Sequence, residues 1–270
     1  MDASTQLWWT ALCSVAALNV SAWVWSARRL HQGQTSLDLR RMQRLQLLLA
    51  AGYVLGCGYR SLLPVYDVPR ICMVDSWASS VIVGRSVATV AELCFAAQWA
   101  LLLGGIARVS GHRPAQWVAR SVLPLIALAE VFSWTAVLTT ANLGHVLEES
   151  LWGLVAVLLA ISLIFAIPRC AASARPWLLL GGSAGLVYAA YMFGVDVPMY
   201  WTRWLADEAA GRPYLTLAQG LQDAATRWVV SHQWEHWRGE VIWMTLYFSV
   251  GVWISIGLAH VRLPAARQAE

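Results

Sequence analysis

Lysine is absent from this chain of 270 residues, and all 19 basic residues are arginine. A seven-helix retinal pigment attaches its chromophore to a lysine amine, so the absence excludes Schiff-base chemistry of that kind. Charge of either sign is also scarce, at 13% of residues against about a quarter in a typical soluble domain. Because 59% of the residues are hydrophobic, the composition predicts a protein whose solvent is lipid.

Several familiar signatures are missing as well. The sequence contains no C-x-x-C pair, Walker loop, G-x-S-x-G elbow or H-E-x-x-H motif. The five cysteines are therefore interpreted mainly as small apolar fillers, with a Cys57–Cys72 disulfide as the one pairing considered. The net charge of +4 comes from arginines that orient the chain, so no nucleic-acid partner is predicted.

The hydrophobic residues occur in blocks of about 20, the length of helix that crosses about 30 Å of hydrocarbon. Seven blocks predict an all-α integral membrane bundle of seven transmembrane helices, in a single polytopic domain over residues 1–270. We expect the first helix to be retained, because Met1–Thr5 lacks the basic residues of a signal peptide. The predicted spans are about Gln6–Ala27, Leu45–Pro64, Val81–Ile106, Val118–Asn142, Val146–Ile167, Trp177–Val197 and Glu240–Val261.

The distribution of arginine predicts the orientation of these spans. Cytoplasmic loops are enriched in arginine, and the short loops on one side carry the larger share. This places the N-terminus outside and the C-terminus in the cytoplasm, in the cell membrane, which is the inner membrane if the source is a Gram-negative bacterium. The basic segment Arg28–Arg44 could bind anionic lipid headgroups, although orientation alone explains its charge.

The longest polar stretch, Pro198–Gly239, is expected outside. Leu217, Leu221, Ala224 and Trp228 recur in it at helical spacing, which predicts an amphipathic helix on the outer face before the last span. His232 and His236 follow at i, i+4 spacing, which would place both rings on one helical face. A metal site there is considered, but ordinary interfacial histidines are favoured and no metal is predicted.

Charged groups inside the hydrocarbon carry the functional signal, because each is costly unless it is paired or hydrated. Glu92 and Glu130 are expected at similar depth near mid-membrane, and two close carboxylates would share one proton. The interpretation is a polar cavity open to the outer side; the alternative is buried ion pairs, such as Arg85–Glu92, that only fix packing. The candidate acid–base residues are Glu92, Glu130, Asp75, Glu149 and Asp196, and the candidate substrate-binding residues are Arg60, Arg85 and Arg203.

Three functions remain open from the sequence. The first is an intramembrane enzyme that acts on a lipid or isoprenoid-like amphiphile, with carboxylates for proton transfer and arginines for the headgroup. The second is a proton-coupled transporter or channel, which spans broken by glycine or proline would favour. The third is a receptor or a subunit of a larger membrane complex. Membrane lipids are the expected partners in each case, and the sequence identifies no cofactor.

Overall fold

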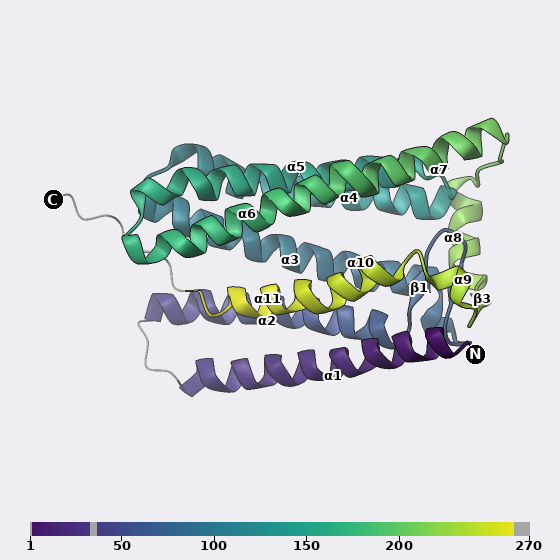
Figure 1. Cartoon of the computed structure of the whole chain (residues 1–270), viewed down its shortest axis with the longest axis horizontal. Coiled ribbons are helices and arrows are strands. Elements are labelled where there is room, and N and C mark those ends of the chain that lie inside the picture. The colour runs from purple at the N-terminus through teal and green to yellow at the C-terminus, as the bar shows by residue number, and fades with distance from the viewer. Residues whose placement is uncertain (1, 33–36, 262–270) are drawn as a thin grey trace. The chain divides into compact units, whose positions relative to one another are not determined.

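The described part of the chain is mainly helical (Figure 1). The computed structural model describes residues 2–32 and 37–261. The long helices are α1 (Ala3–Gln32), α2 (Leu37–Leu62), α3 (Val81–Ser110), α4 (Arg113–Thr139) and α5 (Leu143–Ala166). The shorter ones are α6 (Arg175–Tyr191), α7 (Val197–Ala209), α8 (Leu217–Thr226), α9 (Trp234–Trp237), α10 (Val241–Leu246) and α11 (Val252–Leu258). Strands β1 (Val65–Tyr66), β2 (Ile71–Cys72) and β3 (Val229–Val230) form a sheet in that order.

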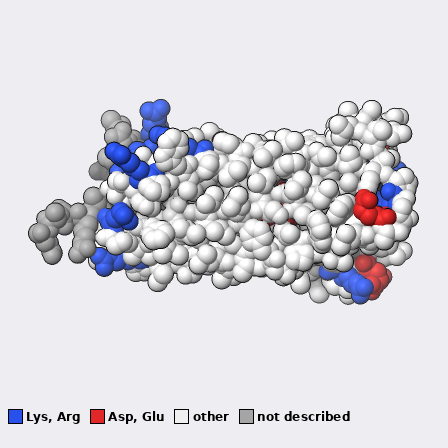
Figure 2. Space-filling view, turned by 90° about the horizontal axis from the view of Figure 1, so that it is seen from above, with Lys and Arg blue, Asp and Glu red and all other residues white. Residues whose placement is uncertain are grey.

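Six helical segments of the described chain are long and apolar enough to cross a membrane. They are Ala3–Gln32, Val81–Ser110, Arg113–Thr139, Leu143–Arg169, Ala172–Ala209 and Val241–Leu258. Figure 2 agrees with this, because the side chains along the middle of the helices are mostly uncharged on the face in view and charged groups gather near helix ends. The chain is therefore a multi-pass helical membrane protein. Helix α2 is not among the six, so the count of seven spans and the orientation stay predictions.

Two of these spans contain a π-helical segment. Met192–Asp196 joins α6 to α7, and Tyr247–Gly251 joins α10 to α11. The sequence predicted a span end at Val197 followed by a polar stretch, but the helix continues to Ala209. Pro198 is compatible with this because it lies in the first turn of α7, directly after the wider π turn.

The chain divides into two compact units. Unit 1 is formed by residues 2–98 and 215–261, and unit 2 by residues 99–214. Helix α3 supplies its first part to unit 1 and its last part to unit 2. The single domain expected from the sequence stays a prediction.

Helices α1 and α2 of unit 1 run antiparallel and are joined by hydrogen bonds at three levels. The Trp9 indole donates to the Leu62 carbonyl at 3.2 Å, near the start of α1 and the end of α2. Cys13 contacts the Ser61 carbonyl at 3.7 Å. Near the other ends, the Trp23 indole donates to Leu47 at 3.0 Å. The two helices therefore cover the same length of unit 1.

The sheet of unit 1 joins segments that are far apart in sequence. Strand β2 pairs antiparallel with β1 and parallel with β3. The start of α1 lies at the same end, because the Asp2 backbone donates to the His232 carbonyl at 3.2 Å and its carboxylate accepts from the Trp234 backbone at 2.7 Å. A buried core lies beneath, formed by Trp8, Tyr53, Met73, Trp237, Met244 and Phe248.

Buried amides fix the helices of unit 1 in register. Gln46 and Gln98 each donate to the other's backbone carbonyl, at 2.9 and 3.0 Å, and Gln98 also donates to the Ser255 carbonyl at 3.0 Å. Asn19 of α1 donates at 2.8 Å to the carbonyl of Phe248, which lies in the π-helical segment. These bonds satisfy polar groups that lipid cannot solvate.

Small residues allow close packing in unit 2. An added Cβ at Gly144 of α5 would lie 2.6 Å from the Phe132 carbonyl oxygen of α4. A Cβ at Gly153 would lie 2.8 Å from the ring of Phe193. Glycine therefore brings α4 and the π-helical segment against α5, as small residues do at interfaces of membrane helices.

All five cysteines are free, including Cys57 and Cys72, so the disulfide considered from the sequence is not formed. Helix α8 forms at the predicted amphipathic segment. Thr216 and Gln219 make a capping box at its start. Leu217 and Leu221 are exposed on it, while Gly220 and Ala224 are buried.

Candidate functional site

A buried acid–base pair occupies the first turns of α5 in unit 2. His145 Nδ1 lies 2.8 Å from Glu148 Oε2, and the i, i+3 spacing on the helix brings them together. His145 is 7% exposed and Glu148 is 4% exposed. A carboxylate and an imidazole at hydrogen-bond distance can pass a proton between them, which is the arrangement used in general acid–base chemistry.

A second carboxylate approaches this pair from α4. Glu130 is 4% exposed, and one of its oxygens lies within 4.8 Å of one oxygen of Glu148. Two full negative charges at that separation would repel by roughly 3 kcal/mol at a protein-like dielectric. The pair is therefore suited to hold a proton or a small cation. We refer to Glu130, His145 and Glu148 as the acid–base cluster.

Helix α7 adds an aromatic ring and an arginine beside the cluster. The Tyr200 ring lies 4.8 Å from the His145 ring, measured between centroids. Arg203 Cζ lies 5.3 Å from the centroid of the Tyr200 ring. Tyr200 therefore contacts both the imidazole and a guanidinium, a group whose forked donors suit a phosphate or carboxylate.

The loop between α4 and α5 is also held to α7. Asn142, the residue before α5, donates from Nδ2 to Asp207 Oδ2 at 2.8 Å. Arg212 contacts the same carboxylate oxygen at 3.0 Å. Thr140 has a positive φ of 63° and ends α4 in the left-handed region. These contacts fix the start of α5, and with it the positions of His145 and Glu148.

The predicted site residues fall into two sets. Arg60, Asp75, Arg85 and Glu92 belong to unit 1, and Glu130, Glu149, Asp196 and Arg203 belong to unit 2. In unit 2, Glu130 is brought to Glu148, while the neighbouring Glu149 is only half-buried. Asp196 lies in the π-helical segment and interacts with Tyr191 and Arg203. The single outward-facing cavity stays a prediction.

In unit 1 the predicted arginines bind near neighbours. Arg85 contacts Glu92 at 2.9 Å, and both are buried in α3, as in the packing alternative considered from the sequence. Arg60 donates to the Val65 carbonyl at 3.0 Å. Asp75 is exposed and accepts a 3.0 Å hydrogen bond from Trp228. Arg60 and Asp75 thus flank the small sheet.

The two histidines weighed as metal ligands are held by separate partners. His232 Nε2 donates to the Met73 carbonyl at 2.9 Å, and His236 Nδ1 lies 2.7 Å from the Ser231 hydroxyl. They do not share a helical face, because α9 begins after His232. Neither belongs to a group of three metal-ligand side chains within residues 2–32 and 37–261.

Sequence reasoning missed His145 and Glu148. The candidates selected from the sequence include Glu149 instead of Glu148, although consecutive helical residues point about 100° apart. The signal that could have found the pair is H-x-x-E at the start of an apolar span. Comparisons of the chain with protein-family models, curated proteins and solved structures returned no match.

Proposed function

We propose that this protein is a seven-span membrane enzyme that acts by carboxylate acid–base chemistry on a lipid or isoprenoid-like amphiphile. The observation that carries the proposal is the approach of the buried Glu130 and Glu148 carboxylates to within 4.8 Å, with the His145 imidazole bonded to Glu148. One carboxyl would act as the acid and the other as the base. An apolar surrounding favours this division, because it disfavours two ionised carboxylates side by side. His145 would orient Glu148.

The antiparallel contacts of α1 and α2 support the seventh span. Because Trp9 meets Leu62 and Trp23 meets Leu47, α2 returns over the length that α1 covers. A membrane crossed by α1 is then crossed again by α2. The proposed orientation has the N-terminus outside and the C-terminus in the cytoplasm. The proposed membrane is the bacterial inner membrane, for a Gram-negative source.

Arg203 is the proposed contact for the headgroup. It lies over Tyr200, whose ring contacts the His145 ring, so a phosphate or carboxylate held by Arg203 would bring the attached chain towards the cluster. Glu149 and Asp196 of the same unit remain candidates in this reaction, to be tested in the same way. The roles predicted from the sequence for Arg60, Asp75, Arg85 and Glu92 of unit 1 stay predictions. The amphiphile's tail would lie along the apolar helix faces.

The test compares lipids from membranes that contain the full chain with lipids from membranes that contain variants. Mass spectrometry of the extracts should show one lipid species consumed and another formed with the wild type. Glu148→Gln and Glu130→Gln should each reduce the conversion at least 100-fold, the scale of general acid–base catalysis. Glu235→Gln is the control, because the Glu235 side chain is 67% exposed. If wild-type and empty membranes have the same lipids, the enzyme proposal is wrong.

A proton-coupled transporter is the second candidate, and the two π-helical segments favour it. Met192–Asp196 and Tyr247–Gly251 interrupt the regular hydrogen bonding of two spans, as broken helices of transporters do. In proteoliposomes, a proton gradient should then drive solute uptake that Glu130→Gln abolishes. Uptake that is unchanged in this variant would eliminate proton coupling through the cluster.

A further inference from the structure

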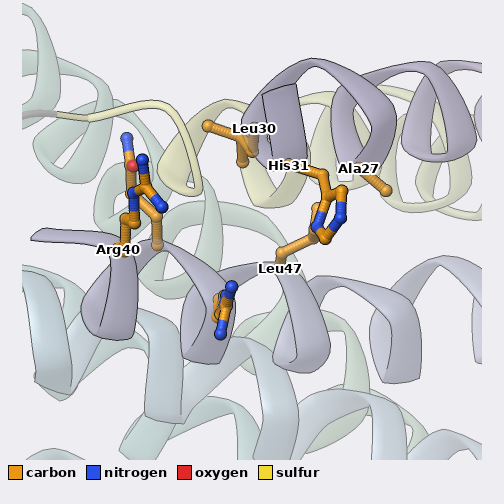
Figure 3. Close-up of a pocket in the computed structure, with 7 residues that line it drawn as sticks. Ala27, Leu30, His31, Arg40 and Leu47 are labelled. Atoms are coloured by element: carbon orange, nitrogen blue, oxygen red, sulfur yellow. The ribbon is translucent and has the colours of Figure 1, made fainter. Parts of the chain in front are cut away.

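A pocket lies where the end of α1 faces the beginning of α2 in unit 1. Its wall consists of Ala27, Leu30 and His31 from α1 and Arg40, Gln43, Arg44 and Leu47 from α2, and its volume is about 70 Å³. Figure 3 shows Leu30 and His31 on one helix facing Arg40 and Leu47 on the other. The Trp23–Leu47 hydrogen bond joins the two helices beside the pocket and sets their spacing there.

The charge of this pocket is of one sign. Arg40 and Arg44 are four residues apart on α2 and therefore share a face, where like charges destabilise each other. His31 adds a ring N–H, and Gln43 is buried with an amide that can donate. Among the described residues that line the pocket, none is acidic. An anion in the pocket could accept hydrogen bonds from both guanidinium groups.

The other lining residues are apolar. Ala27, Leu30 and Leu47 lie beside the cationic groups, so the pocket presents forked donors next to a hydrocarbon wall. A free phosphate would use only the donors. A phospholipid would use both parts, with its phosphate on the arginines and the first carbons of its tails on the leucines.

We propose that this pocket binds the phosphate of an anionic phospholipid in the leaflet at this end of α1 and α2. Arg40 and Arg44 hold the phosphate oxygens, and Gln43 and His31 donate to the remaining ones. The ligand also joins α1 to α2 at the ends that lie farthest from the sheet. No residue of this site belongs to the acid–base cluster, so a test of the lipid site does not depend on the enzyme proposal.

Native mass spectrometry of the detergent-purified full chain tests the site, with phosphatidylglycerol and phosphatidylcholine as probes. The wild type should retain phosphatidylglycerol in preference to phosphatidylcholine. Arg40→Gln with Arg44→Gln should lower phosphatidylglycerol affinity at least tenfold, because two charged hydrogen-bond donors are lost. Arg108→Gln with Arg120→Gln removes the same charge from exposed positions outside the pocket and should change the affinity less than twofold.

A further variant and a competitor keep the result interpretable. Arg40→Lys with Arg44→Lys keeps the charge but removes the paired donors of each guanidinium group. This variant should bind phosphatidylglycerol with intermediate affinity. Millimolar inorganic phosphate should not displace the lipid; displacement would assign the pocket to free phosphate and overturn the lipid proposal. If both double glutamine variants lost phosphatidylglycerol affinity equally, net charge alone would explain the loss, and this result would also overturn the lipid proposal. Unchanged melting temperatures without lipid show that the variants are folded.

Discussion

Arg70 and Asp223 are 153 positions apart in the sequence, yet Arg70 Nε donates to Asp223 Oδ2 at 2.8 Å. Arg70 is fully buried and has a φ of 61°, a conformation that few residues other than glycine adopt. Its guanidinium also donates to the Asp67 carbonyl at 2.9 Å. The pair therefore ties the turn between β1 and β2 to α8.

Replacing Arg70 by glutamine should destabilise unit 1 by about 3 kcal/mol, because it leaves a partly buried carboxylate without one of its two arginines. Thermal unfolding in detergent and thiol labelling measure this, since Cys72 in β2 is buried and should become reactive. Arg238→Gln is the matched control. Its ion pair with Glu235 is about two-thirds exposed and should contribute less than about 1 kcal/mol. Equal effects of the two substitutions would contradict this role of Arg70.

Stability should also fall in acid through Asp223. Hydrogen bonds from Arg227 and Arg70 lower the pKa of this carboxyl below its ordinary value of 3.8. A lowered pKa in the folded state contributes stability that is present above pH 3.8 and is lost as the pH falls through the folded pKa. Melting temperatures measured between about pH 6 and pH 2 should decrease more steeply in the wild type than in Asp223→Asn. Parallel curves would contradict the assignment.

Gln98→Leu should lower the stability of unit 1 by about 1–3 kcal/mol, because the Ser255 hydroxyl loses its acceptor and the backbone carbonyls of Gln46 and Ser255 each lose a donor in an apolar interior. The Ser255 hydroxyl donates to Gln98 Oε1 at 2.5 Å, so Ser255→Ala should cost less than the loss of the whole amide. Gln222→Leu on the exposed face of α8 is the control. Denaturant unfolding in detergent gives all three values, and a neutral Gln98→Leu would show that the amides are not structural.

Gly144→Ala should separate α4 from α5. The added Cβ would meet the Phe132 carbonyl oxygen at 2.6 Å and the Ala136 backbone nitrogen at 2.8 Å, and backbone atoms cannot rotate away. A loss of about 1–3 kcal/mol is expected from such overpacking. Gly58→Ala, in α2 with open space around the new Cβ, should be neutral or slightly stabilising. Because Gly144 precedes His145, the same variant should also weaken any activity of the cluster.

Labelling of single cysteines in a variant without the native ones tests seven spans against six. With the proposed topology, Trp77→Cys and Ala218→Cys react with an impermeant reagent from outside intact cells. Ala172→Cys reacts only after permeabilisation. Trp77 is 63% exposed, and Ala218 and Ala172 are also exposed, so access does not limit the reaction. Labelling of Trp77→Cys from the cytoplasmic side alone would remove α2 as a span.

The six apolar helical segments could be predicted because lipid requires long apolar helices, and such helices appear in the sequence as long apolar runs. The continuation of α6 through Asp196 into α7 could not, because Pro198 normally ends a helix and only the π turn accommodates it. The strands were missed because each has two residues, too few for a pattern.

Only part of the candidate site could be predicted from the sequence. Residue type and depth pointed to Glu130, but the rotation of α5 selects Glu148 rather than Glu149, and packing sets that rotation. Gly144 and Asn142 determine it through contacts with α4 and α7. Such contacts between helices leave no periodic signal in a single sequence.

The hydrogen bonds between Asp2 and the segment His232–Trp234 have a consequence for biosynthesis. A ribosome makes the chain from its N-terminus, so Asp2, Trp8 and Asn19 emerge more than 200 residues before their partners at His232, Thr245 and Phe248. Residues 99–214 of unit 2 are all translated within that interval. The first helices must therefore wait in the bilayer without these partners, and unit 1 is completed only after residues 99–214 of unit 2 have been made.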